Sequence, residues 1–170
     1  VLFRSDALAE AHSHGIVHRD LNPRSIFVHH VGASGDFIKV FDFRIGIPTS
    51  AKRELLVSQD PHYMAPEQIL GEGVSFKTDL YAVGVLGYQL LTGHPPFEGT
   101  DRPDIVAGHI EKLPVPPRVN GRILSDPLSN LLLQCLHKSP DVRPSSAADM
   151  LTYLKLPHHL EEILARSEEH

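Results

Sequence analysis

The 170 residues carry a formal net charge of −5, and no stretch is rich in lysine or arginine, which argues against a nucleic-acid-binding surface. Hydrophobic residues make up 41 % of the chain, enough for one domain with a sizeable core. A single cysteine excludes a disulfide framework and favours a cytoplasmic location. No apolar run reaches the roughly 18 residues of a membrane-spanning helix, so we expect no membrane segment here, and any anchor of the parent protein lies elsewhere.

The first part of the chain predicts one helix followed by two short strands. Residues Ala7–His14 favour a helix, and Gly15 is a natural stop because glycine adopts the left-handed conformation at low cost. The residue pattern predicts strands at Ile26–His29 and Phe37–Phe41, with a turn at 32–36 between them. A ribbon of two strands is marginal alone, so we expect it to pack against helices.

The rest of the chain predicts helices separated by loops. Residues 42–66 have weak periodicity and contain Pro48, as expected for a long loop. The segment Leu80–Leu91 is apolar nearly all round but too short to cross a bilayer, which indicates a buried core helix. Cys135 is expected to be a buried thiol, and residues 104–113 an exposed helix. The expected helices are Glu67–Leu70, Lys77–Leu91, Asp104–Leu113, Ser125–His137 and Ser146–Leu156.

Residues 18–25 read His-Arg-Asp-Leu-Asn-Pro-Arg-Ser, and four further motifs follow them in order. These are Asp-Phe-Arg at 42–44, Met-Ala-Pro-Glu-Gln at 64–68, Asp-Leu-Tyr-Ala-Val-Gly at 79–84 and Pro-Asp-Val-Arg-Pro at 140–144. Together the five motifs resemble the protein kinase superfamily. The sequence around 64–68 and 92–97 is most similar to bacterial serine/threonine kinases.

The resemblance implies a mainly α fold, the C-terminal or large lobe of a kinase. This lobe is a helical bundle with a short β-ribbon that carries the catalytic loop and the Asp-Phe-x loop. We assign residues 6–156 to this domain and residues 157–170 to a tail or linker. Residues 1–5 are a sequencing scar or remain unassigned. The chain contains no glycine-rich phosphate loop, strand lysine or partner glutamate, so we expect a truncated kinase domain whose small lobe lies outside it.

The resemblance also implies the chemistry, which is transfer of the γ-phosphate of ATP to a serine or threonine of a protein substrate, with Mg²⁺ as the metal. Asp20 takes the place of the base that accepts the proton of the substrate hydroxyl. Asn22 stands where serine/threonine kinases have a lysine against the transferred phosphate. Asp42 and Ser25 hold the positions of the magnesium ligands in the nucleotide site. Phe27 falls where the family places an apolar floor under adenine, and a core phenylalanine is an equal alternative.

Four positions depart from the family pattern. They are Asn22 in place of lysine, Ser25 in place of asparagine, Arg44 in place of the glycine of Asp-Phe-Gly, and Asp60 in place of a threonine beside the base. Two of these changes make the site more negative, which opposes a phosphate unless Arg24 or Arg44 compensates. The alternative function is therefore a pseudokinase, a binding or scaffold module without turnover. In either case we expect the isolated chain to be inactive, because half of the nucleotide cleft is missing.

Other residues are expected to hold or regulate the fold. By resemblance, Glu67 and Arg143 form a buried ion pair, and Asp79 accepts hydrogen bonds from the backbone of the catalytic loop. Arg19 precedes the base, so a phosphate on a serine or threonine within 42–66 would have a cation to dock on. The twelve histidines show no zinc-ligand spacing, and we expect them to be solvated or capping residues.

Overall fold

A computed structural model describes residues 6–30, 36–44, 60–119, 121–123 and 127–154. Most of these residues lie in helices, as the mainly α expectation required, and two short antiparallel ribbons complete the fold. The helices and strands in chain order are α1 (Asp6–Ser13), β1 (Ile26–His30), β2 (Asp36–Val40), α3 (Pro66–Leu70), α4 (Phe76–Thr92), α5 (Arg102–Glu111), β3 (Arg118–Val119), β4 (Arg122–Ile123), α6 (Pro127–Cys135) and α7 (Ala147–Leu154).

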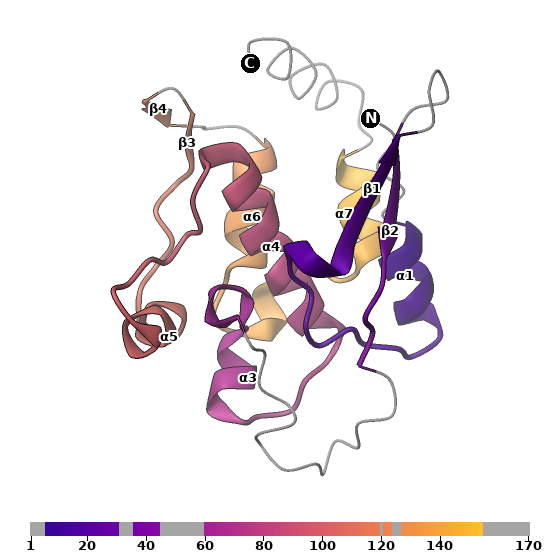
Figure 1. The fold of residues 1–170 in the computed structure, drawn as a ribbon, viewed down its shortest axis with the longest axis horizontal. Helices are drawn as coiled ribbons and strands as arrows, with labels where there is room; N and C mark the ends of the chain where they lie inside the picture. Colours follow the sequence, from indigo (N-terminus) through magenta and orange to yellow (C-terminus); the bar gives the residue numbers. More distant parts are fainter. Residues whose placement is uncertain (1–5, 31–35, 45–59, 120, 124–126, 155–170) are drawn as a thin grey trace.

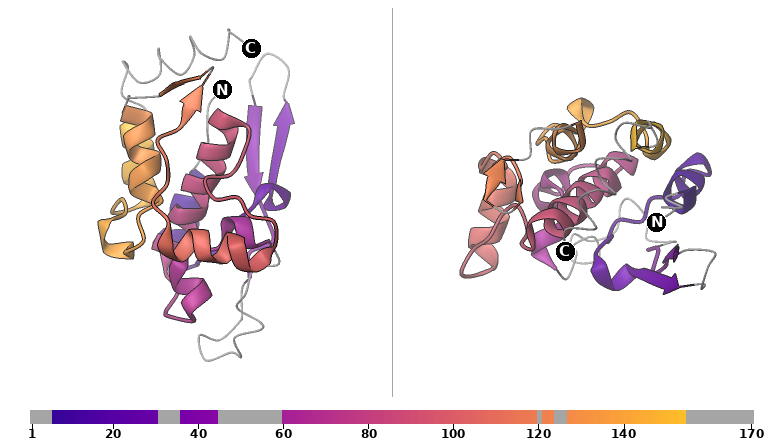
Figure 2. Two further views of the ribbon diagram at one scale, coloured as in Figure 1. Left: turned by 90° about the vertical axis from the view of Figure 1, so that its left-hand side faces the viewer. Right: turned by 90° about the horizontal axis from the view of Figure 1, so that it is seen from above.

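Helix α4 runs through the middle of the molecule, with α5 on one side and the β1–β2 ribbon and α1 on the other (Figure 1). Seen from above, α6 and α7 lie along one flank of α4, and the ribbon lies across from them (Figure 2). Among the described helices, none is both long enough and apolar enough to cross a membrane.

Helix α4 is the predicted core helix, one residue longer at each end than expected. The Ser75 hydroxyl caps its start by accepting a hydrogen bond from a backbone N–H of the first turn. Gly93 ends it at a φ of 83°, a left-handed conformation that glycine adopts without strain. Leu80, Tyr81 and Val85 are fully buried, which confirms the expectation of a core helix.

The core consists of two apolar clusters that share α4. The first lies between α1, α4, α6 and α7, and its buried members are Leu8, Leu21, Leu80, Ala82, Leu131, Cys135, Ala147 and Met150. The second lies toward the 3-10 turn η3 (Pro61–Tyr63), and its buried members are Tyr63, Ala65, Tyr81, Val85, Tyr88, Phe97 and Leu136. Cys135 is buried as expected, and burial raises the pKa of its thiol to about 12, so it stays protonated at neutral pH.

Strands β1 and β2 pair antiparallel, with Ile26 opposite Val40. Both predicted strands are confirmed, although β2 starts and ends one residue earlier than expected. Residues 31–35, which contain most of the expected turn, lie outside the described residues. The Phe27 side chain is 53 % exposed on β1, so the alternative that it is a core phenylalanine is wrong.

Helix α5 differs most from its expectation. It begins at Arg102 rather than Asp104, because the Asp101 carboxylate accepts a hydrogen bond from the Asp104 N–H at 2.9 Å and so caps an earlier turn. The expectation of an exposed helix is wrong, since Ile105 and His109 are buried against the rest of the fold.

The C-terminal part contains one unexpected feature, a small hairpin of β3 and β4 in which Gly121 has a φ of 77°. Helices α6 and α7 lie within the spans predicted for them, and α3 starts one residue earlier than expected. The Ser146 hydroxyl caps the start of α7 by accepting a hydrogen bond from the Asp149 N–H at 3.0 Å. The segments 1–5 and 157–170, assigned to a scar and a tail, lie outside the described residues.

Candidate active site

The loop at 18–25 is fastened to α4 by one carboxylate. Asp79 accepts hydrogen bonds from the His18 N–H at 2.8 Å and from the Arg19 N–H at 2.9 Å, which confirms its predicted role. His12 of α1 also lies against it, with Nε2 2.8 Å from an Asp79 oxygen. The His12 side chain is nearly buried, so the expectation of a solvated or capping histidine is wrong at this position.

Two side chains that the sequence analysis did not single out complete the support of this loop. The buried His18 ring accepts the Asp20 N–H at Nδ1 and donates from Nε2 to the Phe41 carbonyl at 2.9 Å. Gln68 of α3 donates from Nε2 to the Arg19 carbonyl at 2.7 Å. These side chains reach carbonyls 23 and 49 positions away, and no local sequence pattern marks such contacts.

A reciprocal cap shapes the second half of the loop. The Asn22 side chain accepts the Arg24 N–H at 2.9 Å and donates to the Asp20 carbonyl at 2.7 Å. The Ser25 hydroxyl donates to the Asn22 carbonyl at 2.8 Å and accepts the Asn22 N–H at 3.1 Å. Both side chains therefore fold the loop into the 3-10 turn η1 (Pro23–Ser25). Asn-Pro-x-Ser is a capping pattern with proline at the first helical position, so the sequence does carry a signal for this role.

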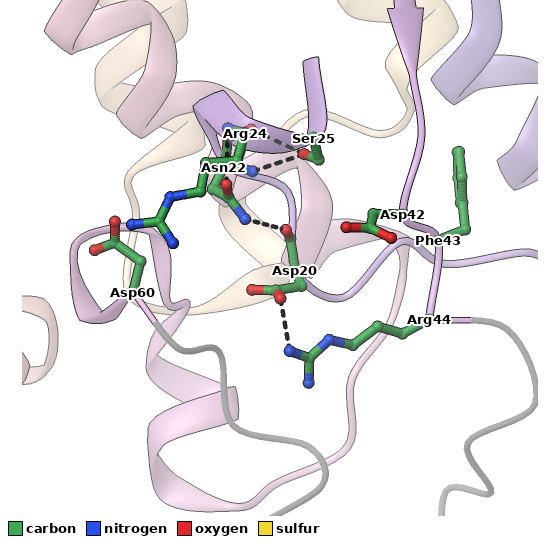
Figure 3. A pocket seen from close by; sticks show the side chains of 8 residues that line it. All are labelled: Asp20, Asn22, Arg24, Ser25, Asp42, Phe43, Arg44 and Asp60. Atoms are coloured by element: carbon green, nitrogen blue, oxygen red, sulfur yellow. Dashed lines mark hydrogen bonds and ion pairs between the residues drawn. The ribbon is translucent and has the colours of Figure 1, made fainter. Parts of the chain in front are cut away.

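A cavity of about 330 Å³ opens beside this turn. Its lining residues are Asp20, Asn22, Arg24, Ser25, Asp42, Phe43, Arg44 and Asp60. In Figure 3, Asp20 and Asp42 face the same space from two different loops. Four of the five predicted site residues thus meet here, whereas Phe27 is not part of the lining. The three aspartates outnumber the two arginines, so the lining carries an excess of negative charge.

Asp20, the predicted base, is paired with Arg44. A guanidinium nitrogen of Arg44 lies 2.6 Å from an Asp20 carboxylate oxygen, and the two side chains are 23 % and 17 % exposed (Figure 3). Arg44 stands in place of a glycine, but its φ is not positive. Among the described residues, the non-glycine positions with positive φ are Arg19 at 71° and Asp42 at 66°. Arg44 therefore needs no glycine-like backbone. Asp42 takes the left-handed conformation, which aspartate tolerates better than most residues.

Asp60 lines the same cavity as Asp20, as the sequence analysis expected. Its carboxylate accepts the His62 N–H at 3.1 Å and lies 2.9 Å from Nδ1 of the same histidine, so it caps η3. Figure 3 shows Asp60 at the far edge of the cavity from Arg44. The repulsion expected between Asp60 and Asp20 is thus moderated, because each carboxylate has a polar partner beside it.

Away from the cavity, Glu67 and Arg143 form the predicted buried ion pair. Arg143 donates to both Glu67 oxygens at 2.7 and 2.8 Å, and the two side chains are only 3 % and 0 % exposed. The pair joins α3 to the segment before α7 across 76 positions. Arg143 also donates to the backbone carbonyls of Lys77, His137 and Lys138, so its hydrogen-bonding capacity is used within the fold.

A buried tyrosine–histidine contact lies next to that pair. The Arg143 guanidinium sits 4.8 Å from the centre of the Tyr81 ring, and the Tyr81 hydroxyl lies 2.8 Å from Nδ1 of His109. Burial raises the pKa of Tyr81, so the phenol stays protonated and donates a hydrogen bond to Nδ1 of His109. Burial, with the charge of Lys138 nearby, lowers the pKa of His109 to about 3, and its ring is neutral at physiological pH.

Known protein kinases resemble this chain over most of its length. The family profile described as protein kinase domain matches residues 5–154. Serine/threonine-protein kinase Pkn1 of Myxococcus xanthus is 41 % identical over 147 residues, 84 % of this chain and 21 % of Pkn1. The kinase pkn3 of the same organism is 40 % identical over 151 residues, 83 % of this chain and 27 % of pkn3. PknB of Mycolicibacterium smegmatis is 34 % identical over 149 residues, 85 % of this chain and 23 % of PknB, so the chain spans 21–27 % of these three relatives.

Proposed function

The chain belongs to the protein kinase family, and on that premise we propose that residues 6–156 are the large lobe of a serine/threonine protein kinase. The whole protein would transfer the γ-phosphate of ATP to a serine or threonine of a protein substrate. The rest of the nucleotide cleft belongs, in this proposal, to parts of the protein outside this chain. The observation that carries the proposal is that Asp20 and Asp42 line one cavity although they come from different loops.

In the proposed reaction Asp20 orients the substrate hydroxyl and takes its proton. The hydroxyl oxygen bonds to the γ-phosphorus, the bond from that phosphorus to the bridging oxygen breaks, and ADP leaves with the electron pair. Such a transfer depends on positioning and on neutralising charge. The bonds from Asp79 to the His18 and Arg19 N–H groups fix the backbone just before Asp20, which supplies the positioning.

The donor set of the cavity fits magnesium. Asp42 is exposed at the cavity, and Mg²⁺ is commonly held by one or two carboxylates together with substrate phosphates. The Ser25 hydroxyl donates once and accepts once in its bonds to Asn22, which leaves one lone pair for a metal or a metal-bound water. When bound, the ion would offset the charge of the phosphates. Phe27, exposed on β1, is proposed as the apolar surface under adenine.

A pseudokinase is the second candidate, and two observations favour it. Arg44 occupies one side of the Asp20 carboxylate, and the Asn22 and Ser25 side chains are engaged in folding their own loop. In this interpretation the fold is kept as a binding or scaffold module, and the cavity binds nucleotide without turnover. The two candidates differ in one measurable quantity, the rate of phosphate transfer.

The test is transfer of labelled γ-phosphate from ATP to a protein serine or threonine by the full-length protein that contains this chain. The proposal predicts magnesium-dependent transfer that falls by about 10²-fold or more in Asp20→Ala. The matched control is Asp149→Ala, which removes an exposed carboxylate on α7 and should leave the rate within about 2-fold. The isolated chain should transfer nothing. Full-length protein that binds ATP without transferring phosphate would refute the kinase and establish the pseudokinase.

A further inference from the structure

A phosphate in this cavity needs a cation. Asp20, Asp42 and Asp60 line the space, and the phosphates of ATP would add to their negative charge. Asn22 stands where a lysine was expected and is neutral. Its amide is also engaged, because it donates to the Asp20 carbonyl and accepts the Arg24 N–H. Beside the proposed Mg²⁺ ion, a further positive charge at the transferred phosphate would come from another lining residue.

The lining offers Arg24 and Arg44, and their geometry separates them. Arg44 lies 2.6 Å from the Asp20 carboxylate and is 23 % exposed, so its guanidinium is held at the predicted base rather than in bulk water. Arg24 is exposed, and Figure 3 shows its guanidinium on the Asp60 side of the cavity. Of these two arginines, Arg44 is the one placed at the reacting carboxylate.

We propose that Arg44 binds the phosphoryl group during its transfer and thereby replaces the charge that Asn22 lacks, an inference that rests on the proposed function. A guanidinium presents five N–H donors in a planar fork that matches phosphate oxygens. The Arg44 guanidinium lies at the reacting carboxylate and lines the cavity, where a phosphate oxygen can take the place of the Asp20 oxygen. The predicted metal ligand Asp42 lies two positions before Arg44, so one short segment would supply both the metal site and the cation.

The same contact has a competing interpretation, in which Arg44 locks Asp20 and prevents turnover. The pair lines a cavity that a ligand can enter, so a phosphate can compete with Asp20 for the guanidinium. The two interpretations predict opposite signs for the removal of Arg44. A phosphate-binding arginine is needed for transfer, whereas a lock slows it.

The first experiment measures kcat for phosphate transfer in the full-length protein. Arg44→Gly restores the residue that the family resemblance expects, and we predict a loss of about 10²-fold, the size found when one transition-state donor is removed. Arg44→Lys should keep kcat within about 10-fold, and adding Asn22→Lys to Arg44→Gly should recover most of the loss. Arg102→Ala, at an exposed position of α5, should leave kcat unchanged. An Arg44→Gly protein as fast as the wild type would overturn the proposal, and a faster one would overturn it in favour of the lock.

The second experiment keeps this inference separate from the proposed function. Binding of inorganic tripolyphosphate without metal is measured for the same full-length proteins. We expect Arg44→Gly to weaken binding by about 10-fold or more, and Asn22→Lys to restore it in that background. Weakened binding in a protein that transfers no phosphate would support the role of Arg44 and refute the kinase activity. Equal affinities of wild type and Arg44→Gly would overturn the role of Arg44 whether or not transfer occurs.

Discussion

Two arginine–carboxylate pairs sit in contrasting surroundings. The scaffold pair, Glu67–Arg143, is closed to solvent, makes two charge-assisted hydrogen bonds, and has further backbone partners. The pocket pair, Asp20–Arg44, is partly open to solvent at the edge of a cavity, with a nitrogen–oxygen contact of 2.6 Å. The chemical groups are alike, but one pair is enclosed by the protein and the other faces a space that a ligand can enter.

The surroundings of such a pair, and not its residue types, decide what the pair does. A buried pair that loses one partner leaves an uncompensated charge in the interior, which is strongly destabilising. A pair at the edge of a cavity leaves its remaining partner within reach of water when the other is lost, so its loss costs less stability than that of an enclosed pair. The scaffold pair is therefore expected to govern folding, and the pocket pair to govern ligand binding and catalysis.

Loss of the scaffold pair should lower the free energy of unfolding more than any other change considered below. Arg143→Ala leaves the buried Glu67 carboxylate without its cation and should lower the free energy of unfolding by about 3–5 kcal/mol. That is a large share of the roughly 5–15 kcal/mol of a typical domain. Urea denaturation of the domain measures the change. The matched control is Arg102→Ala, an exposed arginine on α5 that should change the midpoint little; equal midpoints for both variants would contradict a structural role of Arg143.

The next effect concerns pH and the histidine beside the scaffold pair. The pKa of His109 is lowered from 6.5 to about 3 by burial and by Lys138, so the folded state binds its proton less readily than the unfolded state. The stabilising contribution is therefore complete above pH 6.5 and is lost as pH falls toward 3. Between pH 7 and 4 the free energy of unfolding should fall by about 3 kcal/mol from this group alone.

His109→Gln isolates that contribution. Glutamine can accept a hydrogen bond from the Tyr81 hydroxyl but does not titrate in this range. Denaturant melts of both proteins at pH 7 and 4 give the difference. The variant should lose less stability on acidification than the wild type. Parallel losses in the two proteins would mean that His109 is not held neutral in the fold.

A smaller effect tests the packing of the scaffold apart from its charges. A Cβ added at Gly84 of α4 would lie 2.7 Å from the Cβ of Cys135 on α6. Gly84→Ala should therefore force α4 and α6 apart and lower the free energy of unfolding by about 1–3 kcal/mol. At Gly73 an added Cβ meets nothing within 4 Å, so Gly73→Ala is the matched control. Indistinguishable urea midpoints for the two variants would show that the helices do not pack this closely.

The smallest effect is the loss of one cap. The Ser146 hydroxyl accepts the Asp149 N–H at the start of α7, and Ser146→Ala should lower the free energy of unfolding by about 1 kcal/mol. Ser139 precedes the 3-10 turn η4 (Pro140–Val142) without a side-chain cap bond, which makes Ser139→Ala the control. Thermal melts should separate the two variants, and a control that melts as low as Ser146→Ala would remove the cap as the explanation.

The scaffold was more predictable from sequence than the pocket. The position of α4 followed from its apolar pattern and from the glycine and prolines after it, and these signals are local. The contacts of Asp79 and the Glu67–Arg143 pair followed from family motifs, because these residues lie in strings that the resemblance identifies. Local residue patterns and family motifs can both be recognised in a single sequence.

Four lining residues of the pocket followed from the same motifs, but the contacts that their side chains make could not be predicted in this way. The sequence left Arg24 and Arg44 as equal candidates for the compensating cation, because the choice depends on how the end of β2 sits against the 18–25 loop. The contact of His12 with Asp79 joins α1 to α4 across 67 positions, and no local sequence pattern predicts it. Side-chain direction in such contacts is set by tertiary packing, so only the folded structure reveals it.

We propose that the pocket is a magnesium-dependent phosphate-transfer site carried by a scaffold that does not depend on it. The most direct test is the Mg²⁺ dependence of phosphate transfer by the full-length wild type and Asp42→Asn. Asparagine tolerates the φ of 66° at this exposed position, so the backbone should be kept. The account predicts at least about 10-fold more Mg²⁺ for half-maximal transfer by the variant, with an unchanged urea midpoint. Superimposable Mg²⁺ curves would contradict it.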